Sequence, residues 1–219
     1  MNTANRKVKD PVSGYLHVMG ALLSALGLLL LLGKATAAGG SPWHYVSFSV
    51  FGAGLILLYT ASSVYHLLNL KPAAMLVFRK LDHIMIFVLI AATYTPICLL
   101  PLRGPWGWGL LGAVWGCAIA GIVMKALFFK APRWLYTVCY VLLGWSCVIC
   151  VVPMLRTIPP GGLLLLLGGG IAYSLGAVFY ATKWPGRNAR WFGFHEVFHV
   201  LILVGSLCHY LMVYLYLAV

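Results

Sequence analysis

Seven long apolar stretches follow one another along this chain, and short polar turns separate them. Each stretch has roughly the 20 apolar residues that a helix needs to cross the hydrocarbon core of a bilayer. The stretches cover approximately residues 15–33, 44–68, 81–101, 106–129, 134–153, 161–181 and 194–218. The sequence therefore predicts an all-α integral membrane protein, in which residues 1–219 form a single seven-helix transmembrane domain.

Composition supports the membrane class and argues against a nucleic-acid partner. Hydrophobic residues make up 63% of the chain and charged residues 8%, with a mean hydropathy of +0.97. No soluble domain buries that much apolar surface. The net charge is +12, but the basic residues lie between the apolar stretches and form no continuous patch. We therefore expect the partner to be the lipid bilayer, in a multi-pass cell-membrane protein (plasma or inner membrane).

The basic residues also predict how the chain is oriented. If the N-terminus is cytoplasmic and the chain crosses seven times, 12 of the 15 basic residues fall in cytoplasmic segments. These are Arg6, Lys7, Lys9, Lys71, Arg79, Lys80, Lys125, Lys130, Arg133, Lys183, Arg187 and Arg190, whereas Lys34, Arg103 and Arg156 fall outside. Basic residues are enriched in cytoplasmic loops. The pattern predicts a cytoplasmic N-terminus and an external C-terminus.

Three histidines fall at the cytoplasmic side of this arrangement. His66 ends the second stretch, and His195 and His199 begin the seventh, one helical turn apart and therefore on one helix face. Three imidazoles from two helices form the tripod of a catalytic zinc site, which keeps its fourth position open. We therefore predict that these histidines bind Zn²⁺.

Two further polar residues fall at the same depth and suggest a catalytic role. Asp82 begins the third stretch and is placed to act as a general base and then a general acid. Ser62 lies one turn before His66, where its hydroxyl would orient a metal ligand or a substrate carbonyl. Two simpler alternatives remain open: Asp82 pairs with Arg79 or Lys80 at the interface, and Ser62 bonds the backbone of its own helix.

The remaining acidic and histidine residues have structural interpretations. His195-Glu196-Val197-Phe198-His199 matches the H-E-x-x-H pattern of zinc metalloproteases. Glu196, however, points about 100° away from His195 on a helix, so we interpret it as a solvated interfacial carboxylate. Asp10 precedes Pro11 at a helix start. Four histidines without a partner at ligand spacing are interpreted as hydrogen-bonded contacts between helices: His17, His44, His83 and His209.

Together these motifs resemble a known family. Ser-x-x-x-His ends the second stretch, Leu-Asp begins the third and His-x-x-x-His begins the seventh. This is the pattern of the progestin and adipoQ receptor family, and the chain is most similar to its bacterial haemolysin III-type (TrhA-like) branch. The phrases at 92–96 (Ala-Thr-Tyr-Thr-Pro) and 173–176 (Tyr-Ser-Leu-Gly) strengthen the resemblance.

The resemblance implies seven helices with a cytoplasmic N-terminus, zinc on the three histidines, and Ser62 and Asp82 beside it. Alkaline ceramidases share this metal pattern, which implies hydrolysis of a lipid amide. The resemblance gives Glu196 no role as a base. The family's glutamate before the first span is replaced by Asp10 in this chain.

Several functions are compatible with these residues. The first is a zinc-dependent intramembrane hydrolase of a lipid amide or ester that serves membrane-lipid homeostasis, with a membrane lipid as substrate. The second is a lipid sensor or receptor-like protein in which zinc is structural. A pore or transporter is disfavoured, because few ionisable residues lie at the membrane midplane and no pair of broken helices is apparent. An intramembrane protease would need Glu196 as its base.

Overall fold

The computed structural model describes residues 10–128, 132–184, 186 and 192–218, and this part of the chain contains helices and no strand. The elements are α1 (Pro11–Ala37), α2 (Pro42–Leu67), α3 (Pro72–Leu99), α4 (Pro105–Leu127), α5 (Arg133–Gly144), the 3-10 helix η2 (Trp145–Cys150), α6 (Val151–Thr157), α7 (Pro160–Thr182) and α8 (Phe194–Tyr216). Because α5, η2 and α6 are continuous, they form one rod. The described chain thus contains seven helical rods.

Proline determines where many of these helices begin. It occupies the first helical position of α1, α2, α3, α4 and α7, where its missing N–H would have no helical partner and its fixed φ suits the helix. Inside a helix, proline has the opposite effect. Pro153 has no N–H to donate to the carbonyl of Ile149, which lies in the 3-10 segment η2 that precedes α6.

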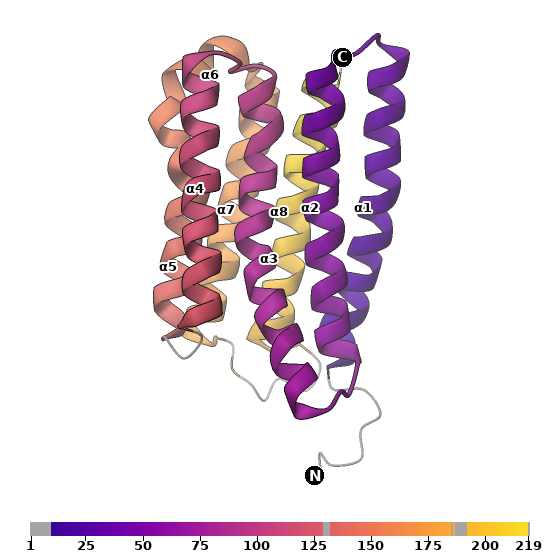
Figure 1. Ribbon diagram of the computed structural model, residues 1–219, viewed down its shortest axis with the longest axis vertical. Coiled ribbons are helices and arrows are strands. Elements are labelled where there is room, and N and C mark those ends of the chain that lie inside the picture. Colours follow the sequence, from indigo (N-terminus) through magenta and orange to yellow (C-terminus); the bar gives the residue numbers. More distant parts are fainter. Residues whose placement is uncertain (1–9, 129–131, 185, 187–191, 219) are drawn as a thin grey trace.

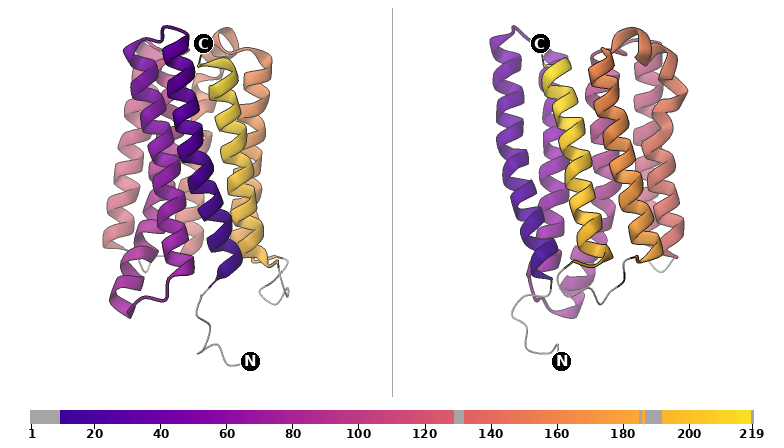
Figure 2. Two further views of the ribbon diagram at one scale, coloured as in Figure 1. Left: turned by 90° about the vertical axis from the view of Figure 1, so that its right-hand side faces the viewer. Right: turned by 180° about the vertical axis from the view of Figure 1, so that it is seen from behind.

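The rods form one bundle in which sequence neighbours pack side by side (Figures 1 and 2). α1 packs on α2, α2 on α3, and α3 on α4, whereas α7 packs on α8, and α8 returns to α1. α3 also contacts α5 and α8, and every residue from 91 to 99 in α3 is buried. The start of α1 and the end of α8 lie at opposite ends of the bundle (Figure 1).

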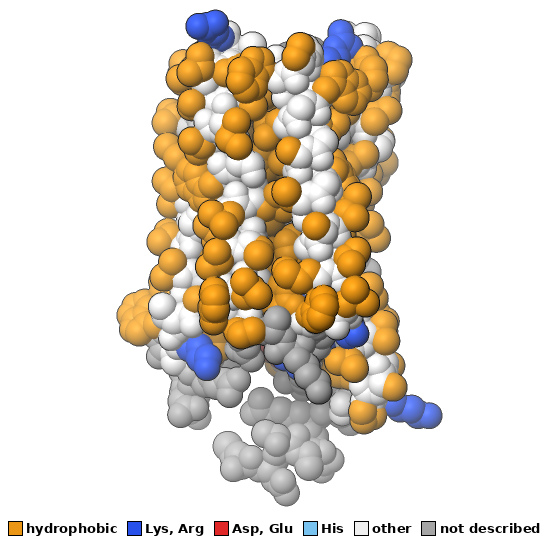
Figure 3. Space-filling view, turned by 60° about the vertical axis from the view of Figure 1, so that its left-hand side comes forward, with side chains coloured by type: hydrophobic (Ala, Val, Ile, Leu, Met, Phe, Trp, Pro, Cys, Tyr) orange, Lys and Arg blue, Asp and Glu red, His pale blue; other side chains and the backbone are white. Residues whose placement is uncertain are grey.

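The outer surface is that of a membrane protein. Six helices are long and apolar enough to cross a bilayer: α1, α2, α4, the fifth rod from Trp134 to Thr157, α7 and α8. Hydrophobic side chains cover the length of the bundle, and Lys and Arg side chains gather at its two ends (Figure 3). The prediction of a helical, multi-pass membrane protein is confirmed. The remaining rod, α3, is a 28-residue helix packed among the others.

One helix differs clearly from its predicted extent. α3 begins at Pro72, whereas the sequence placed the third stretch at about residues 81–101. Arg79 and Lys80 interrupt the apolar pattern between residues 72–78 and the predicted stretch, yet the helix continues through them without a break. This extension projects beyond the neighbouring helices (Figure 1).

The two ends of the bundle differ in how many basic residues they carry. Lys71, Arg79, Lys80, Lys125, Arg133 and Lys183 belong to the end at which α1 begins, and Lys34, Arg103 and Arg156 belong to the other. Arg6, Lys7, Lys9, Lys130, Arg187 and Arg190 lie outside the described residues.

Candidate metal centre

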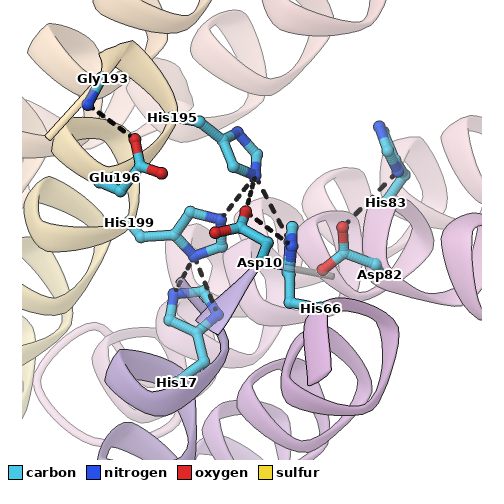
Figure 4. Close-up of polar contacts among 9 residues, drawn as sticks. All are labelled: Asp10, His17, His66, Asp82, His83, Gly193, His195, Glu196 and His199. Atoms are coloured by element: carbon cyan, nitrogen blue, oxygen red, sulfur yellow. Dashed lines mark hydrogen bonds and ion pairs between the residues drawn. The ribbon is translucent and has the colours of Figure 1, made fainter. Parts of the chain in front are cut away.

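The three predicted ligand histidines converge at the end of the bundle where α1 begins (Figure 4). His66 lies in the last turn of α2, and His195 and His199 lie in the first two turns of α8. One ring nitrogen from each histidine lies within 4.8 Å of those from the other two, so the group could hold a metal ion. The sequence prediction of a three-histidine group is confirmed in this respect.

The spacing of the nitrogens fits a single metal ion. His195 Nε2 lies 3.4 Å from His66 Nε2 and 3.1 Å from His199 Nε2. Two nitrogens bound at about 2.1 Å from a tetrahedral ion would lie roughly 3.4 Å apart. A neutral imidazole carries only one N–H, so three Nε2 atoms that face one another cannot all be paired by hydrogen bonds. A cation among them would satisfy the lone pairs.

Two residues of α1 and its start support the ligand histidines from behind. His17 Nε2 lies 2.7 Å from His199 Nδ1, and both rings are buried. Asp10 Oδ2 lies 3.2 Å from His66 Nδ1 and 3.9 Å from His195 Nε2, although the His66 approach lacks the geometry of a hydrogen bond. The contacts at Nδ1 of His66 and His199 orient these two rings and favour the tautomer that presents Nε2 to a metal. Asp10 approaches His195 on its Nε2 side instead.

The charge of Asp10 suits this position. Burial raises the pKa of the Asp10 carboxyl, but the close approach and charge of His66, together with the charge of His195, outweigh burial and leave the pKa below its usual value. Asp10 therefore remains an anion facing the histidines, where it would offset part of the charge of a bound cation.

Sequence reasoning did not assign this supporting role. His17 was predicted to make a hydrogen-bonded contact between helices, which is confirmed, but its partner was not identified as a ligand histidine. Asp10 was interpreted only as a helix start. A signal was present, because residues 10 and 17 are seven apart and therefore share one helix face. Their common face points toward the start of α8 (Figure 4).

Ser62 is buried with an unpaired hydroxyl. Its side chain is 1% exposed, and its Oγ has no hydrogen-bond partner among the described residues. The neighbouring Ser63 hydroxyl donates instead to the carbonyl of Tyr59 at 2.6 Å. The alternative in which a serine bonds its own helix backbone therefore describes Ser63, whereas Ser62 lines the cavity beside the histidines.

Asp82 lies on α3, across the cavity from the start of α8. Its Oδ2 is 3.8 Å from His83 Nδ1, and the carboxylate lines the same cavity as the ligand histidines. Figure 4 places it on the far side of His66 from Asp10. The His83 ring also lies 2.8 Å from the carbonyl of Arg79 in its own helix.

Glu196 caps α8. Its Oε2 accepts a hydrogen bond of 2.8 Å from the backbone N–H of Gly193, and its carboxylate points away from the three Nε2 atoms (Figure 4). The interpretation of Glu196 as a solvated interfacial carboxylate is incomplete, because this half-buried side chain also satisfies an N–H at the helix start. The H-E-x-x-H match therefore reflects a helix-capping glutamate between two histidines that could hold a metal.

Two other histidines depart from their predicted role as hydrogen-bonded contacts between helices. The backbone N–H of Ser41 donates to His44 Nδ1 at 3.1 Å, so His44 caps its own helix. His209 contacts Tyr173 of α7, with ring centroids 5.3 Å apart, but its Nδ1 has no hydrogen-bond partner among the described residues. Helical spacing does not reveal either arrangement, since both depend on rotamers and neighbouring helices.

A long apolar cavity begins at the histidines and runs up the interior of the bundle. Its volume is about 670 Å³, a size that accommodates a lipid-like molecule. The cavity reaches Met154 and Leu155 near the end of the fifth rod, and Leu163 near the start of α7. Those residues belong to the opposite end of the bundle from His195 (Figure 1). The histidines therefore terminate a deep, mostly apolar chamber.

These features define a class: a multi-pass helical membrane protein in which three histidines, two buried and one half-buried, form a candidate metal centre at one end of an apolar chamber. Comparison with known proteins identifies the family. The chain matches the family model described as Haemolysin-III related over residues 5–210. It belongs to the haemolysin III family, within the wider progestin and adipoQ receptor superfamily, and the resemblance seen in the sequence is confirmed.

Individual relatives cover most of the chain. The chain is 38% identical over 211 residues to the Hemolysin-3 homolog of Bacillus subtilis (strain 168), covering 95% of each protein. It is 36% identical over 208 residues to Hemolysin-3 of Bacillus cereus, covering 94% of this chain and 91% of the relative. A more distant match is the Heptahelical transmembrane protein ADIPOR2 of Oryza sativa subsp. japonica, which is 31% identical over 189 residues, covering 75% and 79% respectively.

Proposed function

We propose that this protein is a zinc-dependent hydrolase that cleaves an amide or ester bond of a membrane lipid and thereby contributes to membrane-lipid homeostasis. The observation that carries this proposal is the junction of two features: the three-histidine centre lies at the end of an apolar chamber long enough for an acyl chain. A metal that only fastened helices together would not require such access.

Zinc is the metal that best suits these ligands. His66, His195 and His199 would hold it through neutral imidazole nitrogens, a donor type that zinc favours, in a set that leaves the fourth position open. When bound, the ion would supply a Lewis acid that polarises a lipid carbonyl and activates a water molecule for attack. Asp10 and His17 hold two of the ligands in the required orientation.

Two residues beside the centre supply the remaining chemistry. Asp82 accepts a proton from the attacking water and returns it to the departing amine or alcohol of the lipid. The buried Ser62 hydroxyl, which has no partner among the described residues, donates a hydrogen bond to the substrate carbonyl. Both residues line the chamber together with the ligand histidines.

The chamber determines which part of a lipid enters. An acyl chain leaving the bilayer exchanges one apolar environment for another, so burial alone adds little selectivity. The polar groups that the lipid presents to the chamber wall therefore decide which lipid binds. A carbonyl near the histidines is the first such group.

We place this reaction at the cytoplasmic leaflet. In the proposed topology all seven rods cross the membrane, including α3, with the N-terminus cytoplasmic and the C-terminus outside. Support comes from the opposite locations of the start of α1 and the end of α8 (Figure 1) and from the excess of basic residues at the histidine end. The rice relative is likewise named as a heptahelical transmembrane protein.

A second candidate is a lipid sensor in which zinc is structural. One observation favours it: the ligands and their supporting residues come from α1, α2 and α8, so a bound metal would fasten the first two helices to the last. An intramembrane protease loses support, because Glu196 is engaged in capping α8.

The test is lipid hydrolysis by purified protein in nanodiscs. Zinc-loaded protein, protein stripped by a chelator, and stripped protein reloaded with zinc are incubated with a panel of ceramide-like amides and acyl esters, and fatty acid release is measured. We expect release that is lost on stripping and restored by zinc. The His195→Ala, His199→Ala double variant serves as the inactive control. If the zinc-loaded parent releases no fatty acid from any lipid in the panel, the hydrolase proposal is rejected in favour of the lipid-sensor proposal.

A further inference from the structure

His209 is a polar residue deep in the bundle that the proposed reaction does not use. It lies on α8 between two buried residues of that helix, Ser206 and Met212. Its ring packs against Tyr173 of α7. Gly169 makes room for this ring, since a Cβ at position 169 would lie only 2.6 Å from His209 Nε2. The two helices thus provide a fitted place for an imidazole.

Nδ1 of His209 has no hydrogen-bond partner among the described residues and is shielded from solvent. The polar groups around it are paired. The hydroxyls of Tyr59 and Tyr173 lie 2.7 and 2.8 Å from Ser206 Oγ, and the indole N–H of Trp145 donates to Ser174 Oγ at 2.9 Å. An unpaired polar group inside a membrane bundle is costly. His209 is therefore the exception that needs a partner.

The same ring lines the chamber that begins at the metal centre. His209 is ten residues beyond His199 on one continuous helix, which corresponds to roughly 15 Å along its axis. Between them the α8 side chain that lines the chamber is the apolar Ile202. On α8, the chamber wall thus presents two imidazoles separated by an apolar interval.

We propose that His209 is a second recognition site in the chamber and binds a hydroxyl group carried part-way along an acyl chain. A neutral imidazole offers one N–H donor and one acceptor nitrogen, and a hydroxyl, which can donate or accept, can pair with either of them. The inference rests on the proposed function in one respect, that the chamber takes an acyl chain. It adds the chemical class of ligand, which is a lipid with a hydroxylated acyl chain. The distance along that chain from the carbonyl to the hydroxyl should match the distance from the metal centre to His209.

The experiment measures displacement of a fluorescent fatty acid from zinc-loaded protein in nanodiscs. The competitors are straight-chain fatty acids of one length, either unsubstituted or with one hydroxyl at successive positions. We expect one positional isomer to bind the parent roughly three- to tenfold more tightly than the unsubstituted acid, as one buried hydrogen bond allows. Other isomers should bind no better than the unsubstituted acid.

Matched variants locate the selectivity. His209→Phe should remove the preference while leaving affinity for the unsubstituted acid unchanged, and His209→Gln, which keeps a donor and an acceptor, should retain part of it. Gly169→Ala should also abolish the preference by displacing the ring. Gly168→Ala should not, because a Cβ there comes no nearer than 4.0 Å to its closest neighbour, Cys208 Sγ. Zinc content is measured in every variant.

Two results would overturn the inference while leaving the hydrolase in place: equal affinity of the parent for all the acids, as expected if only water pairs with His209, or a preference that survives in His209→Phe. If no fatty acid binds to the parent, the result refutes both the proposal that the chamber takes an acyl chain and the proposal of a second site at His209.

Discussion

Replacing His17 with phenylalanine tests whether His17 supports metal binding by holding His199 in place, as the structure indicates. If His199 presents Nε2 to a metal, its Nδ1 carries the proton and donates to His17 Nε2 across 2.7 Å. Phenylalanine keeps the ring and its edge contact with Tyr59, whose centroid lies 4.9 Å away, but it cannot accept the proton. The His199 N–H would then be left without a partner in a buried site.

The size of the effect follows from burial. His17 is 3% exposed and His199 is 2% exposed, so no water easily replaces the lost acceptor. A buried hydrogen bond to a group that gains charge on metal binding contributes about 1.5–3 kcal/mol. The dissociation constant for zinc should therefore rise roughly 10- to 100-fold, the range found when supporting residues of metal ligands are removed.

The assay is competition for zinc between a chelator of known affinity and the detergent-purified protein. His17→Phe should still bind one zinc per chain, but more weakly than the parent. His44→Phe is the matched control, because His44 caps the opposite end of α2 and should change only thermal stability. Equal zinc affinity in His17→Phe and the parent would show that His17 does not support a ligand.

The remaining predictions concern the capping residue, the topology and pH. Glu196→Gln should leave zinc content unchanged and lower the melting temperature only slightly, since an amide can still cap Gly193; loss of all hydrolysis would instead revive the protease. A reporter fused after Val219 should read as external and one near Lys183 as cytoplasmic, and a cytoplasmic C-terminus would remove the seven-span topology. Zinc should dissociate as pH falls, because ligand imidazoles must be neutral. The lowered pKa of Asp10 means that its stabilising charge is present above its usual pKa and is lost only at lower pH. Release under mildly acid conditions, measured by chelator titration, therefore reports the histidines, and pH-independent affinity would contradict imidazole ligation.

The sequence was sufficient to predict the helical class and the three converging histidines. Long apolar stretches dictate helices in a bilayer, and the four-residue spacing of His195 and His199 places them on one face regardless of the rest of the fold. Placing His66 beside them required only that α2 ends where α8 begins. Both inferences depend on distances along a single helix or on which end of the bundle a residue occupies.

The supporting layer could not be predicted in the same way. Which face of α1 meets α8 is decided by packing around small residues such as Gly14, Gly20 and Gly27, whose missing side chains make room for Leu67, Leu203 and Tyr210. That packing brings His17 to His199; the seven-residue spacing from Asp10 places both residues on one face but does not show which helix that face meets. The chamber was also beyond sequence reasoning, because it arises from how α3, the fifth rod, α7 and α8 pack against one another.

Asp82→Asn tests the central claim most directly, because asparagine matches aspartate in shape but cannot accept a proton. General acid–base catalysis contributes about 10²–10⁴-fold to rate. The account predicts that purified Asp82→Asn protein keeps one zinc per chain and the melting temperature of the parent, yet releases fatty acid from the preferred acyl lipid at least about 100-fold more slowly. Hydrolysis by Asp82→Asn at the parental rate would contradict the proposed mechanism.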